Sequence, residues 1–221
     1  MITVIKRIIS PILIFILSKY LRNERVYSYE KIKVAVFPGV FHPGLFFSTK
    51  ILLNHLTEYN FFEKKVLELG AGSGIISIYC QKRGAFVTAS DISEKVIKNL
   101  HLNSKVNNAS IKIILSDLFD NIPDDGFDFI IINPPYFAKD PISENDYAWY
   151  CGRDLEYFKK LFLQLEKFQK KKIIILMILS EDCQIDKIQM IAKNNNYKFK
   201  LVKKIKNWWE VNYLFLIECQ K

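Results

Sequence analysis

The feature that most limits the fold of this 221-residue chain is the alternation of short strands with helices along most of its length. Segments rich in β-branched and aromatic residues alternate with segments whose apolar residues recur at helical spacing. The expected strands are 65–69, 85–90, 111–115, 127–132, 172–179, 197–202 and 213–218, and the expected helices are 75–82, 93–106, 155–168 and 185–194. This alternation predicts an α/β fold with βαβ units and a Rossmann-like doubly wound, mostly parallel sheet. Because no long helix separates the last two strands, we expect them to form an antiparallel C-terminal edge hairpin.

The first 36 residues (1–36) are expected to form a short appendage of helix and strand on a single domain that spans residues 37–221. Residues 8–17 are almost wholly apolar and lie between basic residues, but a bilayer-spanning helix needs roughly 20. We predict that this segment is a helix packed on the domain, with a peripheral membrane contact as the alternative. Residues 27–36 alternate as one strand or a hairpin arm does, and Ser48 is expected to cap the helix that follows.

Half of the residues are apolar and a quarter are charged, which is typical of a globular chain and excludes a disordered one. The net charge of +9 suits contact with RNA, ribosomes or acidic membranes, although a lysine-rich sequence is also basic without a polyanionic partner. The four cysteines are far apart, and neither they nor the three histidines have the spacing of metal ligands. We therefore expect reduced thiols, no metal and no disulfide framework, as in a cytoplasmic protein.

The strand expected at 127–132 ends in an unusual turn, Asn133, Pro134, Pro135 and Tyr136. Each proline fixes its own φ near −65°, lacks an N–H group and restricts the residue before it, so the strand cannot continue. Asn133 is therefore expected at the carboxyl end of a parallel strand, where open α/β sheets bind ligands. The amide oxygen of Asn133 and the proline carbonyl are acceptors suited to hydrogen bonding with an –NH2 group. The aromatic ring of Tyr136 can stack on a flat group. An ordinary strand-to-loop turn is the alternative interpretation of these four residues alone.

A second candidate site is the glycine-rich turn GAGSG at residues 70–74, which follows the strand at 65–69. Glycines permit a sharp turn and a close approach of a ligand to the backbone, with the N-terminus of a helix beneath. The spacing differs from the G-x-G-x-x-G pattern that binds a pyrophosphate, which disfavours a nicotinamide or flavin dinucleotide. Glu68, near the end of the strand, adds an acid that suits a ligand with a cationic amine or a sulfonium.

Two further acids follow successive strands. Asp91 ends the second strand of the alternation, where a carboxylate can accept both hydroxyls of a ribose. Asp117 follows the third, where it can meet an adenine amino group while Leu118 covers the adenine ring. Taken singly, each acid is as well explained as a helix cap or a solvated loop residue. Their common position at the carboxyl ends of successive strands indicates one shared ligand site.

Four segments in this order resemble the class I S-adenosylmethionine-dependent methyltransferases: VLELGAGSG (66–74), SDIS (90–93), SDLF (116–119) and NPPY (133–136). More narrowly, the chain between residues 37 and 179 resembles the N-methyltransferase group that carries the NPPY signature and a methyltransferase small domain. The resemblance implies that S-adenosyl-L-methionine is the cofactor. The residues implied to bind it are Glu68, Gly70, Ala71, Gly72, Gly74, Asp91, Ile92, Asp117, Leu118 and Asn133. The residues implied to be catalytic are Asn133, Pro134, Pro135 and Tyr136, with the amide oxygen of the first and the carbonyl of the second accepting N–H bonds from the target nitrogen.

Two branches of this group compete for the substrate. Residues 148–157 resemble the Gly-Gly-x-Asp-Gly segment of release-factor glutamine methyltransferases, although Cys151 and Leu155 stand where that pattern has glycines. Residues 38–53 resemble a segment of ribosomal RNA guanine-N2 methyltransferases, with Phe46 in place of an expected acid. We predict methyl transfer to a planar amide or amine nitrogen, first of all a glutamine side chain in a protein such as a translation factor.

The alternatives are an RNA N-methyltransferase acting on adenine N6 or guanine N2, an enzyme for a small molecule, and a non-catalytic cofactor-binding scaffold. The positive charge and the Trp208-Trp209 pair mildly favour RNA, since aromatic residues beside lysines suit base stacking and phosphate contact. An apolar edge of the closing hairpin explains that pair more simply. The intact NPPY turn argues against a scaffold, which would not need it.

Overall fold

The computed structural model describes residues 20–124, 126–168, 172–207 and 210–220. Its strands are β1 (Arg25–Tyr29), β2 (Ile32–Val36), β3 (Lys65–Leu69), β4 (Phe86–Asp91), β5 (Ile111–Leu115), β6 (Phe129–Ile132), β7 (Ile174–Ser180), β8 (Tyr197–Lys206) and β9 (Val211–Cys219). Its helices are α2 (Phe47–Leu56), α3 (Ile75–Gln81), α4 (Glu94–Val106), α5 (Glu156–Leu165) and α6 (Ile185–Asn194), with 3-10 turns η1 (Glu144–Ala148) and η2 (Glu166–Phe168). The described elements follow the predicted alternation, with ends that differ by a few residues.

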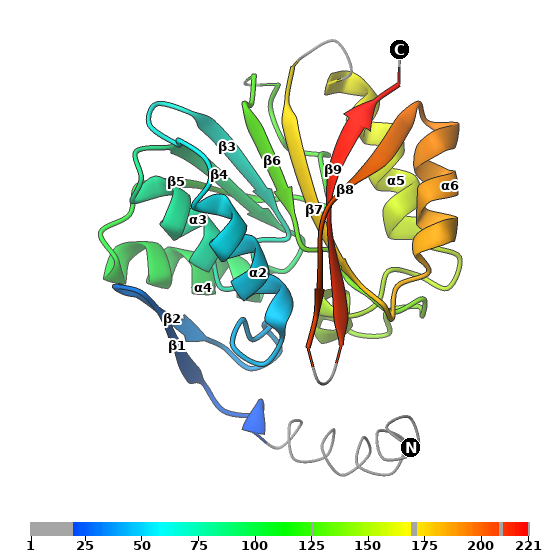
Figure 1. The fold of residues 1–221 in the computed structure, drawn as a ribbon. Coiled ribbons are helices and arrows are strands. Elements are labelled where there is room, and N and C mark those ends of the chain that lie inside the picture. Colours follow the sequence, from blue (N-terminus) through cyan, green and yellow to red (C-terminus); the bar gives the residue numbers. More distant parts are fainter. Residues whose placement is uncertain (1–19, 125, 169–171, 208–209, 221) are drawn as a thin grey trace.

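Seven strands form one sheet in the order β5-β4-β3-β6-β7-β9-β8. The five strands from β5 to β7 pair in parallel. β9 is antiparallel to both β7 and β8, which confirms the predicted edge hairpin. Helices α2, α3 and α4 cover one face and α5 and α6 the other (Figure 1). The predicted α/β class with a doubly wound, mostly parallel sheet is therefore confirmed.

Strand β6 shows why the sheet is covered on both faces. Its four residues are all apolar and buried. Phe129 and Ile131 enter the cluster under α2, α3 and α4, whereas Ile130 and Ile132 enter the cluster under α5 and α6. Because successive side chains of a strand point to opposite faces, a continuous apolar run needs a helical layer on each side. That packing holds the end of β6 rigidly at the centre of the carboxyl edge.

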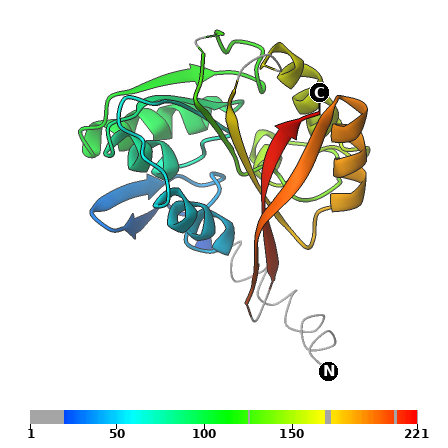
Figure 2. The ribbon, with the colours of Figure 1, turned by 45° about the horizontal axis from the view of Figure 1, so that its top comes forward.

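Strands β1 and β2 form a separate antiparallel hairpin, so residues 27–36, expected as one strand or a single hairpin arm, instead contain parts of both arms and the turn between them. It lies against the helices at one side of the sheet (Figure 2). Asn103 on α4 donates through Nδ2 to the carbonyl of Ala35 at 2.8 Å, and its Oδ1 accepts from the Ala35 N–H at 2.8 Å. The side-chain amide thus acts as a strand partner for β2 and fixes where the loop at 37–46 begins.

One predicted helix start is wrong. Phe46, not Ser48, is the residue before the first turn of α2, and no side chain caps that helix. Ser48 lies inside the helix with 1% of its surface exposed, and its hydroxyl accepts a hydrogen bond from Asn133 instead. In contrast, the Ser93 hydroxyl accepts from the Val96 N–H and caps α4 as predicted.

Two further predictions fall outside the described residues, the helix at 8–17 and the role of the Trp208-Trp209 pair. Within the described ranges, no helix is both long enough and apolar enough to cross a bilayer.

Candidate active site

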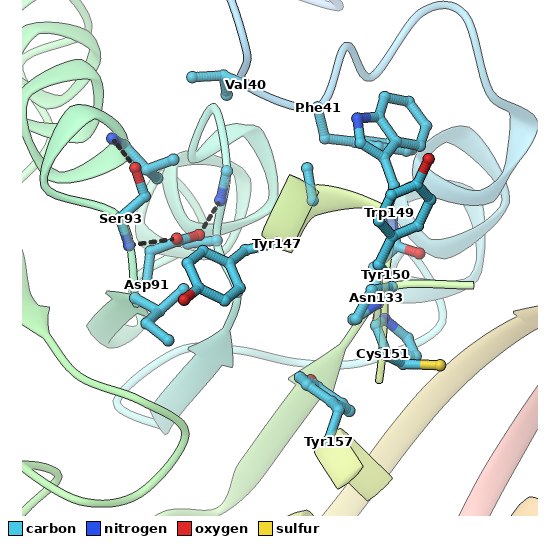
Figure 3. A pocket seen from close by; sticks show the side chains of 18 of the residues that line it. Val40, Phe41, Asp91, Ser93, Asn133, Tyr147, Trp149, Tyr150, Cys151 and Tyr157 are labelled. Carbon is cyan, nitrogen blue, oxygen red and sulfur yellow. Dashed lines mark hydrogen bonds between the residues drawn. The ribbon is translucent and has the colours of Figure 1, made fainter. Parts of the chain in front are cut away.

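A pocket of about 360 Å³ opens at the carboxyl edge of the sheet, over the ends of β3, β4, β5 and β6 (Figure 3). The loop at 37–46, the segment at 137–152 and residues of α2, α3, α4 and α5 contribute the remaining walls. The sequence-predicted site residues that line it are Glu68, Gly70, Ala71, Gly72, Asp91, Ile92, Asp117, Leu118, Asn133, Pro134, Pro135 and Tyr136. Gly74 is outside the lining. It precedes α3 with φ of 77°, and a Cβ there would meet Leu100 at 2.6 Å, so this glycine allows α4 to pack closely.

The Asn133 side chain is held by hydrogen bonds at both ends of its amide. The Tyr136 hydroxyl donates to Oδ1 at 2.9 Å, and Nδ2 donates to the Ser48 hydroxyl oxygen at 3.3 Å. Tyr136 and Ser48 thus hold the two ends of the Asn133 amide. Burial raises the pKa of Tyr136 far above its usual range, so its hydroxyl stays protonated and remains a donor. The two hydrogen bonds set the direction of the Asn133 amide and leave Oδ1 one further lone pair.

Glu68 lies buried beneath the glycine-rich turn. Its Oε2 accepts from the Ser77 N–H at 2.8 Å and from the Ser77 hydroxyl, whereas Oε1 has no hydrogen-bond partner among the described residues. Burial raises the pKa of Glu68 to about 8, with a smaller contribution in the same direction from the Asp91 carboxylate and an opposing one from the Ser77 hydrogen bonds. A Cβ built on Gly70 or Gly72 meets nothing within 4 Å, so open space lies directly over the turn. A cationic ligand there would favour the ionised form of this acid.

Asp91 is the last residue of β4, and backbone donors bind both of its oxygens. The Gly72 N–H donates to Oδ2 at 3.2 Å and the Ser93 N–H to Oδ1 at 3.1 Å. Burial nevertheless raises the pKa of Asp91 to about 6. A second acid stands close by, because Glu144 on η1 accepts from the Ser93 hydroxyl at 2.5 Å. Each carboxylate oxygen can accept more than one hydrogen bond, so Asp91 keeps the capacity to bind ligand hydroxyls.

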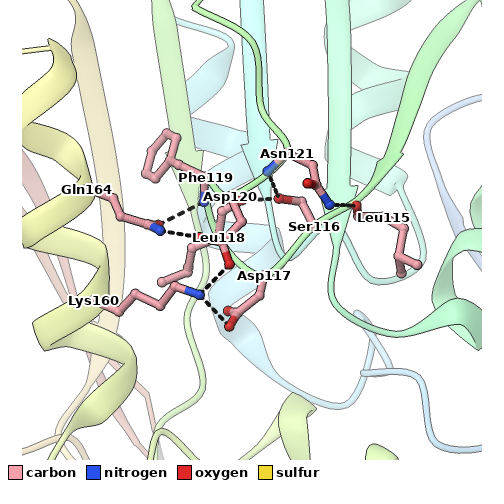
Figure 4. Close-up of polar contacts among 9 residues, drawn as sticks. All are labelled: Leu115, Ser116, Asp117, Leu118, Phe119, Asp120, Asn121, Lys160 and Gln164. Carbon is pink, nitrogen blue, oxygen red and sulfur yellow. Dashed lines mark hydrogen bonds and ion pairs between the residues drawn. The ribbon is translucent and has the colours of Figure 1, made fainter.

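Asp117 has a partner that the sequence did not predict. Lys160 on α5 places its Nζ 2.6 Å from Asp117 Oδ2 and 2.6 Å from Asp120 Oδ2 (Figure 4). These acids raise the pKa of Lys160, whose partial burial acts in the opposite direction. Gln164, one turn further along α5, donates to Asp120 as well. Asp117 is therefore shared between an ion pair and the pocket that it lines.

Three aromatic rings form the pocket wall on the side of Asn133. The centroid of Phe41 lies 4.9 Å from that of Phe46 and 5.4 Å from that of Trp149, and the latter two rings are 5.1 Å apart. Phe41 and Trp149 line the pocket directly (Figure 3). The cluster joins the loop at 37–46 to the segment after the NPPY turn. Sequence reasoning singled out both segments but had no signal that links residue 41 to residue 149.

The turn η1 closes the other side of the pocket, also unpredicted from the sequence. Lys95 Nζ on α4 donates to Asn145 Oδ1 at 3.0 Å. Gly39 lies beneath that side chain with φ of 86°, and a Cβ at Gly39 would collide with Asn145. Gly39 therefore provides both a left-handed backbone conformation and the space that η1 occupies.

Comparison with known proteins places residues 31–149 in the family described as the methyltransferase small domain. A proposed protein N5-glutamine methyltransferase of Methanocaldococcus jannaschii is 34% identical over 160 residues, which covers 68% of this chain and 77% of that protein. A release factor glutamine methyltransferase of Lactococcus lactis subsp. lactis is 43% identical over 84 residues, or 37% of this chain and 31% of that protein. A solved 16S rRNA N2 G1207 methyltransferase of T. thermophilus, in complex with AdoMet and guanosine, superposes with a TM-score of 0.63 at 16% identity. That match covers 90% of this chain and 51% of the other, and it shows the fold alone.

The sheet order and the pocket at its carboxyl edge define a class I methyltransferase fold. The chain belongs to the methyltransferase small domain family and is a methyltransferase that uses S-adenosyl-L-methionine. The site fits this cofactor, because a buried acid with an unbonded oxygen suits its cationic groups and open space lies over the glycine-rich turn. The chain spans about three quarters of the first relative but about a third of the second, so their substrates do not follow from membership in the family.

Proposed function

We propose that the protein methylates the side-chain amide nitrogen of a glutamine in a protein substrate. The observation that carries the proposal is the fixed Asn133 amide beside Pro134, two acceptors that line one pocket at the end of β6. An amide –NH2 group is planar and has two N–H bonds to offer. The two acceptors match the two N–H bonds in number, and the aromatic rings of the pocket wall suit contact with a flat group.

The chemistry follows from these positions. S-adenosyl-L-methionine supplies a sulfonium methyl group that is already a good electrophile. Asn133 Oδ1 and the Pro134 carbonyl accept the two N–H bonds of the target, direct its lone pair toward the methyl group and stabilise the positive charge that develops on nitrogen. The lone pair forms the new N–C bond as the C–S bond breaks with its electron pair going to sulfur. The methylated nitrogen then loses a proton to water, so no general base is required.

The other lining residues take supporting roles in this proposal. Pro135 keeps the turn stiff, and Tyr136 lines the pocket while it orients Asn133. Asp91 accepts the ribose hydroxyls through the lone pairs that its backbone donors leave. Asp117 meets the adenine amino group, which requires its ion pair with Lys160 to be shared with the ligand.

A protein substrate has support from two directions. Two relatives carry glutamine methyltransferase in their names, and one is named for release factors. The segment at 148–157, which resembles the release-factor enzymes, contributes Trp149, Cys151 and Gly152 to the pocket wall next to Asn133. All four cysteines are free thiols, which agrees with a protein that functions in a reducing compartment such as the cytoplasm.

The test is methyl transfer from labelled S-adenosyl-L-methionine into cell extract that has been divided and treated with RNase or with protease. Label that survives RNase and is lost to protease, followed by peptide mass analysis that finds methylglutamine, supports the proposal. Label lost to RNase alone overturns it in favour of an RNA nitrogen. Asn133→Ala should lose turnover even at saturating cofactor, and full turnover in this variant would reject the assigned role of the amide.

A further inference from the structure

The longest described strand, β8, carries a row of lysines. Five of its ten residues are lysine and none is acidic, in the sequence YKFKLVKKIK. The members of this lysine row are Lys198, Lys200, Lys203, Lys204 and Lys206, and all five are exposed. Because β8 is the last strand of the sheet, β9 is its only strand neighbour within the part of the chain that the structure describes. The row therefore lines the open edge of the sheet.

A β-bulge aligns part of the row on one face. Lys200 lies opposite Leu216, and Lys203 lies opposite Leu214, with a register shift between Leu201 and Lys203. Residues three apart on a regular strand point to opposite faces. The extra residue in the bulge restores these two lysines to the same face, where none of the described helices is packed over β8 (Figure 1).

The row is poorly compensated by acids. Lys198 pairs with Glu218 at 3.3 Å. The members that make no ion pair with any described residue are Lys200, Lys203 and Lys206. Glu210, near the tip of the hairpin, is already engaged, because its Oε1 accepts from the Phe47 N–H at 3.2 Å. The row thus concentrates positive charge on a protein whose net charge is +9.

The hairpin extends past the edge at which the pocket opens. Asn212 on β9 pairs with Ser180, the last residue of β7, and Lys206 pairs with Val211 one step further out. Figures 1 and 2 show β8 and β9 projecting beyond the other strands near the start of α2. The row therefore leads along the edge of the sheet toward the side on which a substrate must approach.

We infer that the lysine row of β8 binds the phosphate backbone of RNA, as a docking surface separate from the methyl-transfer pocket. A row of exposed lysines gives sequence-independent, salt-sensitive binding of phosphates. An acidic peptide added as a further strand fits less well, because the bulge interrupts the regular hydrogen-bonding edge of β8. Lysines also protect edge strands from pairing, but that role does not require them to continue beyond the pocket edge. The inference does not depend on which nitrogen is methylated.

The test compares two triple variants of the full chain with equal change in charge. The first is Lys200→Gln, Lys203→Gln and Lys206→Gln. The matched control is Lys98→Gln, Lys105→Gln and Lys159→Gln, which removes three exposed lysines from α4 and α5. Binding to a fluorescein-labelled mixed-sequence single-stranded RNA of about 30 nucleotides is measured by anisotropy between about 50 and 300 mM KCl.

Each lysine–phosphate contact on a single strand contributes about 0.7 to the slope of log K against log salt. The β8 variant should therefore lower the slope by about 2 and weaken binding about 100-fold at 0.1 M salt, with the control within about threefold of wild type. Replacement of the same three lysines by arginine should preserve binding. Unchanged cofactor affinity and unfolding midpoint establish that the variants are folded.

Three outcomes would overturn the inference. Equal weakening in the control would show that diffuse net charge, and not the row, binds RNA. Competition by poly-glutamate as strong as that by RNA would assign the row to an acidic protein. Binding to phosphatidylserine vesicles that depends on the row, with no RNA binding, would assign it to a membrane surface.

Discussion

Replacing Tyr136 by phenylalanine tests whether the Asn133 amide is held in place for catalysis. The change removes the hydroxyl that donates to Asn133 Oδ1 at 2.9 Å and keeps the ring that lines the pocket. A neutral hydrogen bond contributes about 0.5–1.5 kcal/mol, and about 1.4 kcal/mol corresponds to a tenfold change in rate. We therefore expect kcat to fall by about 2- to 13-fold, with the Kd for S-adenosyl-L-methionine unchanged.

The assay is transfer of labelled methyl groups under single-turnover conditions to the protein fraction that accepts label. In an Asn133→Ala background, Tyr136→Phe should cause no further loss, because the hydroxyl acts through the Asn133 amide. Ser48→Ala removes the acceptor of Asn133 Nδ2 and should lower kcat by a similar factor, less than additively with Tyr136→Phe. The control is Tyr59→Phe, which removes a hydroxyl that lies 3.3 Å from His55 outside the pocket and should leave kcat unchanged.

The reasoning fails if Tyr136→Phe retains the wild-type kcat. It also fails if the loss in the Asn133→Ala background is as large as the loss in wild type. A raised Kd for the cofactor with unchanged kcat would assign Tyr136 to cofactor binding and not to the orientation of Asn133.

The remaining predictions concern the walls of the pocket. The pKa of Glu68 is about 8 in the folded protein, against an ordinary value of 4.5. The protonated acid therefore contributes its whole stabilisation of the fold below pH 4.5, and this contribution is lost as the pH rises through 8. Cationic cofactor favours the ionised acid, so calorimetry should show affinity rising about tenfold from pH 7 to pH 9, and Glu68→Gln should abolish that dependence. Gly39→Ala should destabilise the protein by about 1–2 kcal/mol in urea titrations, since φ is 86° and the new Cβ meets Asn145; an unchanged midpoint would contradict this. Trp149→Ala removes ring contacts to Phe41 worth about 0.5–1.5 kcal/mol and should speed cofactor dissociation in stopped flow, whereas an unchanged rate would show that this wall does not retain the cofactor.

The strands and helices were predictable because each depends on a local pattern. The apolar run of β3 and the helical spacing of α6 gave bounds that agree with the structure, Lys65–Leu69 and Ile185–Asn194. The strand ends then brought the predicted acids and the NPPY turn to one pocket, since parallel strands share a carboxyl edge. Asp91 could be predicted as a site residue from its position at the end of a strand alone.

Contacts between distant segments were not predictable in the same way. Ser48 has the sequence signature of a helix cap, but burial and the proximity of Asn133 give its hydroxyl another partner. Lys160 lies 43 positions from Asp117 and faces it only because α5 packs beside the loop that follows β5. The aromatic wall likewise depends on two loops that meet across the pocket, for which no spacing rule exists.

The two hydrogen bonds that hold the Asn133 amide have a consequence for the number of methyl groups added in the proposed reaction. Tyr136 occupies one of the two lone-pair positions on Oδ1, so Asn133 offers a target one acceptor and the Pro134 carbonyl offers another. An unmodified –NH2 group fills both, but a nitrogen that already carries one methyl has a single N–H bond left. To react a second time, this nitrogen would have to place its methyl group against one of the two acceptors. That acceptor would then lack a hydrogen bond, at a cost of about 1–3 kcal/mol. In the proposed reaction, this arrangement therefore sets the product at one methyl group per nitrogen through hydrogen-bond matching, without a steric barrier to the second.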